Sequence, residues 1–408
     1  MEYFLLFLVW IAAALVFPRI LRRFHIPWVT AVILAGILLG PYGLGFVHSD
    51  EVMSFLSTIG LVFLMFTAGL DTKFSVLKSA GRKVAYFALL NICIPLSVGL
   101  SVGFLWGLDT FASILLGICF SSSSVGVIAP MLREFKVESK VSSMLTSAVF
   151  VEDVISLILL AILLNALVPI SGIPLALFPF VLIVFFGVVL FLIPILQEWL
   201  LYWERKENEF EGQMRAVMVT LALVALIAEL IGVHAMVGGF LAGLTLSDML
   251  GARGKIKDHV FAISYGFLIP IFLLNLGMTT NVSTLFAPGD AVFMLVIIGS
   301  SVISKSLSGY LGARLMGFGS RVSFGMGIMT SAQMSTTLAT ASLGLQYGIF
   351  SEEILAALVV LSIVSIICVP LLARWVFGVE VEKPSKFTVM WEGDAVSEDS
   401  NEEEDSRN

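Results

Sequence analysis

The chain has 408 residues, of which 58% are apolar and only 13% are charged. Soluble domains are about half apolar and about a quarter charged, so this composition excludes a water-soluble enzyme and indicates a membrane protein. Ten of the 30 acidic and three of the 23 basic residues follow Gly378, so the formal charge of −7 belongs to this tail and the rest of the chain is neutral. The tail, residues 379–408, is predicted to be acidic, disordered and cytoplasmic, without a binding role.

Thirteen apolar runs are candidates for membrane-spanning helices, since about 20 apolar residues cross the hydrocarbon layer. No basic region precedes the first run, so we expect no cleaved secretory signal. In chain order the runs are Phe4–Phe17, Pro27–Gly40, Val52–Leu70, Val84–Trp106, Phe111–Leu132, Ser142–Leu167, Leu175–Leu196, Met214–Ile231, Ala235–Leu250, Val260–Met278, Ala291–Leu315, Val322–Leu345 and Ile354–Phe377.

The basic residues support this count and orient the chain. The loops after even-numbered runs contain no Lys or Arg, and 22 of the 23 basic residues fall on the other side, with Lys305 as the exception. Because basic loops stay cytoplasmic, the N-terminus is predicted outside and the C-terminus inside.

The fifth and twelfth runs are interrupted by polar residues at matching places. The first interruption is Ser121–Gly126 with Pro130, and the second is Thr330–Thr337. Matching interruptions are typical of the inverted repeats of secondary transporters, although such hydroxyls can also simply bond their own helices. We therefore predict an all-α transporter domain, residues 1–378, with 13 transmembrane helices in two inverted six-helix repeats whose broken helices cross near the midplane. The repeats cover about 1–168 and about 213–378, and a linker helix covers about 174–197.

Three charged residues lie near the bilayer centre. Glu152 and Asp153 are about 15 Å deep in the sixth run, and Lys305 is similarly deep in the eleventh. A charge there costs at least about 2.5–3.5 kcal/mol, which makes each a functional candidate. A purely structural ion pair is the alternative, but adjacent helix residues point about 100° apart, so both carboxylates cannot face one lysine.

A broken helix exposes backbone carbonyls at one end and N–H groups at the other. Carbonyls, a serine hydroxyl and one carboxylate form an oxygen cage that suits a small monovalent cation. A proton and a cation would compete for such a carboxylate, and alternate exposure of the site to the two sides suffices for exchange. The sequence holds no HExxH, G-x-S-x-G or phosphate-binding loop, and its three cysteines have no metal-ligand spacing, so we expect neither an enzyme nor a cofactor.

The ordered motifs resemble the cation:proton antiporter 2 family of prokaryotic sodium/proton antiporters, over about residues 27–375. They are Ile33–Pro41, Leu64–Asp71, Ser123–Val127, Glu152-Asp153, Gly238–Gly243, Pro270–Phe272 with Gly277-Met278, and Lys305 with Gly309 and Gly312–Arg314.

This resemblance implies that Asp153 binds Na⁺ or a proton, with Glu152 beside it and with Ser123 or Ser124 and backbone carbonyls completing the site. Lys305 would compensate the charge. The lining of the unwound helices would comprise Ser121, Ser122, Gly126, Ser331, Gln333, Ser335 and Thr336. Two departures stand out: electrogenic relatives usually carry Asp-Asp where this chain has Glu152-Asp153, and Gln333 replaces a glutamate of many relatives.

The leading hypothesis is therefore an antiporter exchanging Na⁺, or Li⁺, for protons by alternating access. K⁺/H⁺ exchange, a gated cation channel and a sodium-coupled symporter remain the alternatives. The resemblance further implies a homodimer in the inner membrane of a prokaryote. We expect the lipid bilayer as partner, and neither nucleic acid nor a nucleotide-binding regulatory domain. His234, at an outer turn, is interpreted as an ordinary interfacial histidine.

Overall fold

The fold is helical throughout the part of the chain that the computed structural model describes, residues 2–24, 26–71, 81–135, 137–167, 174–205, 210–251, 254–286 and 288–377. The helices are α1 (Glu2–Leu21), α2 (Trp28–Leu39), α3 (Glu51–Leu70), α5 (Arg82–Leu105), α6 (Thr110–Ser121), α7 (Val125–Glu134), α8 (Ser139–Leu167), α9 (Phe178–Arg205), α10 (Phe210–Leu230), α11 (Ala235–Gly251), α12 (Gly254–Ile263), α13 (Ile269–Thr279), α14 (Pro288–Leu315), α15 (Ser320–Thr330), α16 (Ser335–Gln346) and α17 (Glu352–Phe377). Short turns η1 (Arg22–Phe24), η2 (Ser264–Leu268) and η3 (Val282–Phe286) complete the described elements.

Every expected span coincides with a helix or a pair of consecutive helices. Within the described residues, nine helical stretches are long and apolar enough to cross a membrane, and three shorter apolar helices lie in α1, α2 and α11. The remaining span is the broken pair α15 and α16. The fold class is therefore confirmed as an all-α polytopic membrane protein, whereas the count of thirteen stays a prediction. The tail, 379–408, lies outside the described residues.

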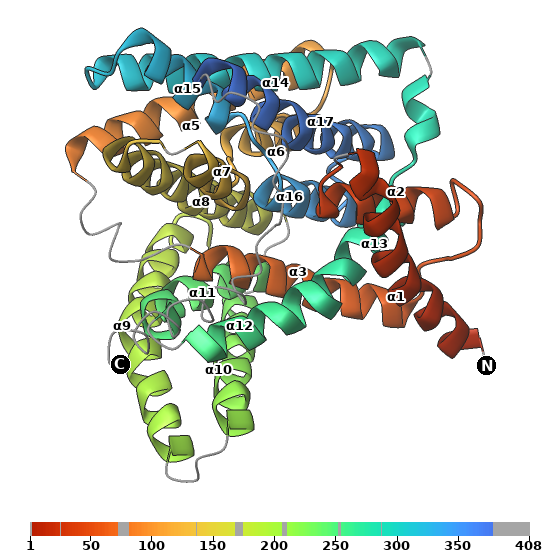
Figure 1. Ribbon diagram of the computed structural model, residues 1–408, viewed down its shortest axis with the longest axis vertical. Helices are drawn as coiled ribbons and strands as arrows, with labels where there is room; N and C mark the ends of the chain where they lie inside the picture. Colours follow the sequence, from red (N-terminus) through yellow and green to blue (C-terminus); the bar gives the residue numbers. More distant parts are fainter. Residues whose placement is uncertain are drawn as a thin grey trace, which may run out of the picture. The chain divides into compact units, whose positions relative to one another are not determined.

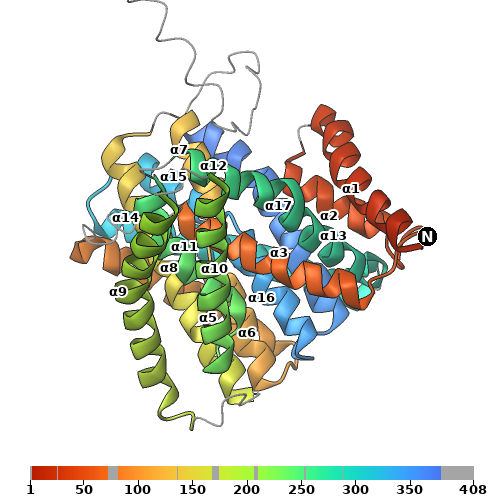
Figure 2. The ribbon, with the colours of Figure 1, turned by 90° about the horizontal axis from the view of Figure 1, so that it is seen from below.

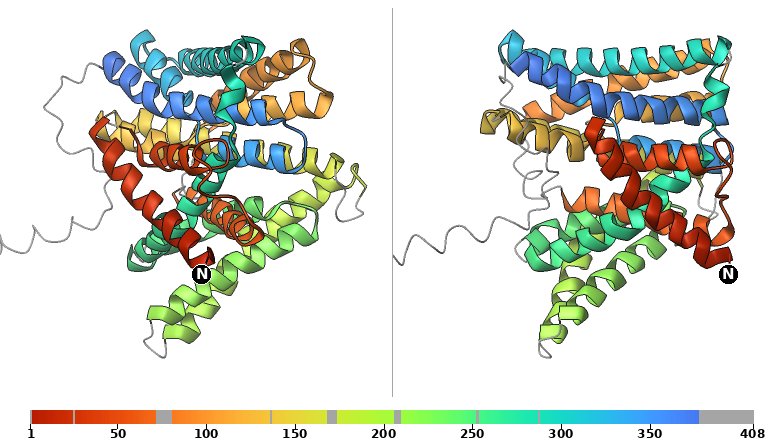
Figure 3. Two further views of the ribbon diagram at one scale, coloured as in Figure 1. Left: turned by 90° about the vertical axis from the view of Figure 1, so that its right-hand side faces the viewer. Right: turned by 45° about the vertical axis from the view of Figure 1, so that its right-hand side comes forward.

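The helices pack as two groups (Figure 1). One contains α5–α8 and α14–α17, and the other contains α1–α3 and α9–α13. In the second group α9 packs on α10 and α11 (Figure 2), and α1 packs across α2 and α13 (Figure 3). Most contacts lie within a group. Few helix pairs make contact between the groups, and α16 with α3 is one of them.

Glycines let α3 and α11 approach closely. A Cβ atom built on Gly243 would lie 2.0 Å from the Phe66 carbonyl oxygen, and one on Gly69 would lie 2.2 Å from that of Phe240. Small residues at such crossings are how membrane helices gain packing contacts, because lipid provides no hydrophobic drive for helix association. Glycines of both helices thus hold α11 tightly against α3, which lines the cavity described below.

The tenth span changes its pitch midway, a feature that the apolar pattern of the sequence does not predict. Residues Ser264–Leu268 form a π-helical turn between α12 and α13, and the Ile269 N–H donates to the Ser264 carbonyl five residues back. Pro270 follows directly and has no N–H to donate to the carbonyl of Gly266, so the regular ladder cannot continue there. Turns of this kind often occur at functional sites, and Tyr265 on this turn faces the site.

Candidate ion-binding site

The two broken helices meet at their breaks. Helix α6 ends at Ser121, three residues run without helical structure, and α7 begins at Val125. Four non-helical residues, 331–334, likewise separate α15 from α16. The Ser124 N–H donates to the Ala332 carbonyl at 2.8 Å, so one unwound segment bonds directly to the other. Pro130, expected to contribute to the first interruption, lies inside α7 instead.

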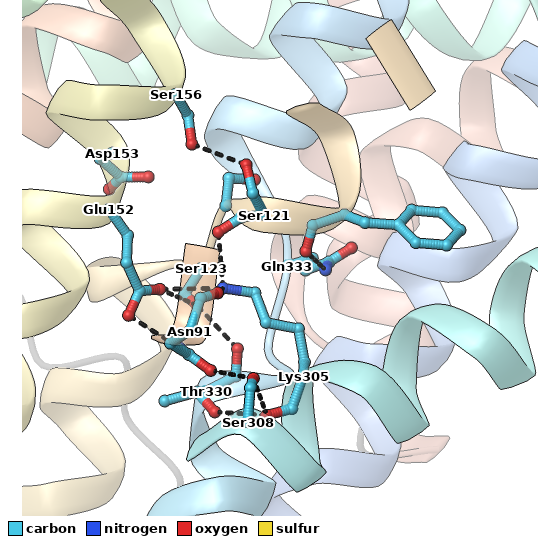
Figure 4. Close-up of polar contacts among 12 residues, drawn as sticks. Asn91, Ser121, Ser123, Glu152, Asp153, Ser156, Lys305, Ser308, Thr330 and Gln333 are labelled. Carbon is cyan, nitrogen blue, oxygen red and sulfur yellow. Dashed lines mark hydrogen bonds and ion pairs between the residues drawn. The ribbon is translucent and has the colours of Figure 1, made fainter. Parts of the chain in front are cut away.

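Lys305 is fully buried at this crossing (Figure 4). Its ammonium donates to the carbonyl oxygens of Asn91 at 3.1 Å and Ser121 at 2.6 Å, and to Glu152 Oε2 at 2.9 Å. An ammonium has three protons, so every one of them has an acceptor. The buried charge is thereby both paired and hydrogen-bonded, which is the condition for tolerating it in a membrane interior.

The two carbonyls that receive Lys305 are free for identifiable reasons. Pro95 stands four residues after Asn91 in α5 and has no N–H to occupy the Asn91 carbonyl. The Ser121 carbonyl lies at the C-terminal end of α6, where the last carbonyls have no partner within the helix. A proline and a helix break thus prepare the acceptors that hold the lysine.

Glu152 is the counter-ion of Lys305 and is also fully buried. Its Oε1 accepts a hydrogen bond from Asn91 Nδ2 at 2.7 Å, and its Oε2 lies 2.8 Å from the Ser123 hydroxyl, which also reaches the Thr330 carbonyl. Ser308 in turn donates to Asn91 Oδ1. Asn91 therefore contacts both members of the ion pair. Asn91 was not among the predicted site residues, although an amide four residues before a proline inside an apolar span was a usable signal.

Asp153 lies apart from this network. Its Oδ1 accepts from the Thr336 hydroxyl at 3.0 Å, and its side chain is 4% exposed. In Figure 4 the carboxylate of Glu152 reaches Lys305, whereas that of Asp153 does not. The expected divergence of the two carboxylates is thus found: one forms the ion pair with Lys305, and the other is available for a different ligand.

A small cavity borders Asp153. Its volume, counted as space for the centre of a water molecule, is about 20 Å³, which is room for about one water or one small ion. It is lined by Leu64, Ala68, Asp71, Val125, Gly126, Asp153, Tyr265, Met334 and Ser335. The wall on one side comes from α3 and η2 and that on the other from α7, α8 and the second unwound segment, so the cavity lies between the two helix groups.

The predicted lining residues divide into three sets. Gly126 and Ser335 border the cavity, and Thr336 holds Asp153. Ser121, Ser122 and Ser331 bond within the breaks: Ser121 contacts Ser156, Ser122 contacts Thr337, and Ser331 donates to its own helix. Gln333 donates from Nε2 to the Phe120 carbonyl and to Ser301, joining the second break to the end of α6.

Ser124 has a different status from Ser123. Ser123 is committed to Glu152 and Thr330, but the buried Ser124 hydroxyl has no hydrogen-bond partner in the structure. A Cβ atom placed on Gly126, which lines the cavity, would lie 3.8 Å from this hydroxyl oxygen. A buried polar atom without a partner requires an explanation, and a bound ion or water is one. Of the two serines, Ser124 is therefore the one whose hydroxyl is still available to a ligand.

The partial charges of the four helix ends at the crossing are arranged by sign. The C-terminal ends of α6 and α15, each equivalent to about half a negative charge, meet the Lys305 network, since Ser121 and Thr330 supply its carbonyls. The N-terminal ends of α7 and α16 carry the opposite charge and lie at the cavity beside Asp153. Lysine thus faces the negative ends and Asp153 the positive ends.

His234 lies at the turn before α11, away from this cavity. Its Nδ1 accepts from the Met236 N–H at 3.2 Å and its ring meets Tyr347 edge-on. Burial lowers the pKa of His234 from 6.5 to about 4. The neutral ring therefore stabilises the fold fully above pH 6.5, and this contribution, about 3 kcal/mol at most, is lost as the pH falls from 6.5 to 4.

We expect His234→Gln to flatten this part of the pH dependence. Melting temperature measured between pH 4 and pH 8 should fall less steeply below pH 6.5 in the variant than in the unchanged protein. His48→Gln, at an exposed position in the loop between α2 and α3, is the matched control and should leave the slope as it was. An identical slope for His234→Gln would contradict the assignment.

A multi-pass helical protein with two broken helices crossing at a buried lysine and a carboxylate-lined cavity is, by fold and site, a secondary transporter. The chain belongs to the sodium/hydrogen exchanger family, whose transmembrane domain matches residues 11–377. It is 30% identical to the probable Na⁺/H⁺ antiporter 3 of Methanocaldococcus jannaschii over 94% of this chain and 99% of that one. It is 27% identical to a Na⁺/H⁺ antiporter of Enterococcus hirae over 92% and 98%.

A solved structure has the same fold. The sodium proton antiporter MjNhaP1 of Methanocaldococcus jannaschii at pH 8 superposes with a TM-score of 0.69 over 92% of this chain and 97% of that one, at 16% sequence identity. The family resemblance inferred from the ordered motifs is confirmed by the match of the family over residues 11–377 and by the relatives named above.

Proposed function

We propose that the protein is a secondary active antiporter that exchanges Na⁺ or Li⁺ for protons by alternating access, and that the two compete for Asp153. One observation carries this proposal: Asp153 is the midplane carboxylate that borders the cavity without pairing with Lys305. Membership of the sodium/hydrogen exchanger family and the names of the relatives support the cargo.

The charges of the site explain how competition works. Lys305 and Glu152 neutralise one another, so the net charge of the crossing changes with what Asp153 holds. Either a proton or a monovalent cation neutralises Asp153. A protonated carboxyl has lost the negative charge and one of the acceptor oxygens that a cation needs, so the two exclude one another. The helix N-termini beside it keep the carboxylate stable while neither is bound.

Oxygen ligands for the cation are available around Asp153. Ser124 offers its unpartnered hydroxyl. Pro130 has no N–H to donate to the carbonyl of Gly126, four residues earlier, which leaves a second oxygen without its usual helical donor. Carboxylate, hydroxyl and carbonyl oxygens suit a hard cation such as Na⁺, and remaining positions are open to water.

The position of the cavity indicates from which side of the membrane an ion reaches Asp153 in this conformation. It includes Asp71 at the end of α3, on the side that the loop charges assign to the cytoplasm. In that orientation the structure corresponds to an inward-facing state. Movement of α5–α8 and α14–α17 against the other helix group would expose Asp153 to the opposite side, since few contacts join the groups.

The remaining sequence expectations fit this function and stay proposals. They are the two inverted repeats, the N-terminus outside and the C-terminus inside, a prokaryotic inner membrane, a homodimer in the lipid bilayer, and transport without a cofactor. The exposed apolar side chains of α9, such as Phe180, Phe191 and Ile195, provide a face for lipid or for a second copy.

Proteoliposomes with an acid-inside pH gradient and a pH-sensitive dye test the proposal. Added Na⁺ and Li⁺ should collapse the gradient, and choline should not. A response to K⁺ alone would reassign the cargo and retain the mechanism, and Na⁺ uptake without proton release would indicate a channel. A gradient that no cation dissipates would contradict the proposed function.

A further inference from the structure

We propose that Asp71 is a second carboxylate for the transported cation, at the inner mouth of the cavity, and that the Lys257 ammonium competes with the cation for it. This inference rests on the proposed function and extends it to the route between the cytoplasm and Asp153. It is carried by the contacts that join Asp71, Lys257, Phe261 and Tyr265 in a row, and by the place of the first and last of them in the cavity lining.

Asp71 occupies a position that a helix alone does not favour. It caps the C-terminal end of α3, where its N–H donates to the Thr67 carbonyl. The end of a helix at this point carries partial negative charge, so a carboxylate there is unfavourable and a cation is favourable. Asp71 also lines the same cavity as Asp153. A bound cation would offset the unfavourable interaction between the carboxylate and the negative end of the helix, which explains an acidic residue at this position.

A positively charged side chain already lies beside this carboxylate. Lys257 Nζ is 3.6 Å from Asp71 Oδ1, and the two side chains are 31% and 34% exposed. This distance exceeds that of a charge-assisted hydrogen bond, which is about 2.7–2.9 Å. Exposed pairs of this kind contribute little to stability, so an arriving ion can displace the ammonium.

An aromatic ring on the same helix face offers the Lys257 ammonium an alternative contact once a cation has displaced it from Asp71. Lys257 Nζ lies 5.2 Å from the centre of the Phe261 ring, within the range of a cation–π contact. Phe261 stacks on Tyr265 at 5.6 Å, and Tyr265 lines the cavity. Lys257, Phe261 and Tyr265 are four residues apart, which places them on one side of α12 and η2.

The geometry therefore describes a path with two carboxylates. A cation first replaces Lys257 at Asp71, while the ammonium stays over Phe261. The cation then moves past Tyr265 to Asp153, which lines the same cavity. Asp71 belongs to α3 and Asp153 to α8, which lie in different helix groups, so the first site loads the second only in the inward-facing state.

The test measures the Na⁺ dependence of exchange by the full chain, inserted so that its inner side faces the added Na⁺. Asp71→Asn should raise the KM for Na⁺ by about 3- to 10-fold, with the maximal rate within about twofold, because one attractive charge is lost at the mouth. Lys257→Gln should lower the KM by a similar factor, because the competing ammonium is gone. In the double variant, Lys257→Gln should have no further effect.

The control is Glu134→Gln, which breaks a comparable exposed pair, Arg374 with Glu134 at 3.1 Å, outside the cavity. It should leave the KM unchanged. A purely structural clamp between α3 and α12 would make Asp71→Asn and Lys257→Gln act in the same direction, so shifts of equal sign, or no shift, would overturn the inference. Asp153→Asn run alongside separates this failure from failure of the proposed function, because loss of exchange in that variant depends on the deeper site alone.

Discussion

Asp153→Asn is expected to reduce Na⁺-driven dissipation of the pH gradient at least about 100-fold, to the level of empty liposomes. The amide is nearly isosteric with the carboxylate, and its oxygen can still accept from the Thr336 hydroxyl. It has no negative charge to offset the desolvation of Na⁺ and no proton to exchange, however, and both are needed at this depth. The rate of dye recovery after Na⁺ addition measures the loss.

The fold should survive this substitution, which allows a second readout. Na⁺ should raise the melting temperature of the unchanged protein relative to choline, because an ion that binds only the folded state stabilises it. Asp153→Asn should melt at a similar or higher temperature in choline and show no Na⁺ shift. Asp290→Asn, in the first turn of α14, is the matched control and should retain both transport and the shift. A Na⁺ shift retained by Asp153→Asn would place the cation elsewhere.

The elements of the site were predictable because charge and polarity are costly in a membrane. Glu152, Asp153 and Lys305 stood out as charges inside apolar spans, and Ser121–Ser124 as a polar break. A single sequence could not show which carboxylate takes the lysine. That choice depends on where α5 brings Asn91, whose amide and carbonyl contact Glu152 and Lys305. Packing between distant spans leaves no periodic signal in either one.

The same limit applies to the fold, where helix positions were predictable and contacts between helices were not. The apolar runs indicated the positions of the helices, since hydropathy reports directly on spanning segments. The π-helical turn at Ser264–Leu268 was not foreseen, because Pro270 by itself is compatible with a kink, a break or a change of pitch. In the sequence Asp71 stood out only as the last residue of the motif Leu64–Asp71. Only the shared cavity connects it with Asp153.

Lys305→Met is expected to destabilise the protein by about 3–5 kcal/mol, the usual cost of removing one partner from a buried ion pair. The substitution leaves the Glu152 charge without its ammonium and removes the donor to the Asn91 and Ser121 carbonyls. The melting temperature in choline should fall sharply, and transport should be lost with it. Ser308→Ala, which removes a neighbouring neutral hydroxyl from Asn91, is the control and should cost far less.

Adding Glu152→Gln to Lys305→Met should restore most of that loss, because the buried charge left behind is then gone. The glutamine can still accept at Oε1 from Asn91 and keep the Ser123 contact, so the cavity beside Asp153 stays intact. We therefore expect the double variant to recover a Na⁺-dependent melting shift, which isolates cation binding at Asp153 from the neutral pair behind it. A double variant as unstable as Lys305→Met would mean that Lys305 holds the broken helices together through their carbonyls, and that its pairing with Glu152 is secondary.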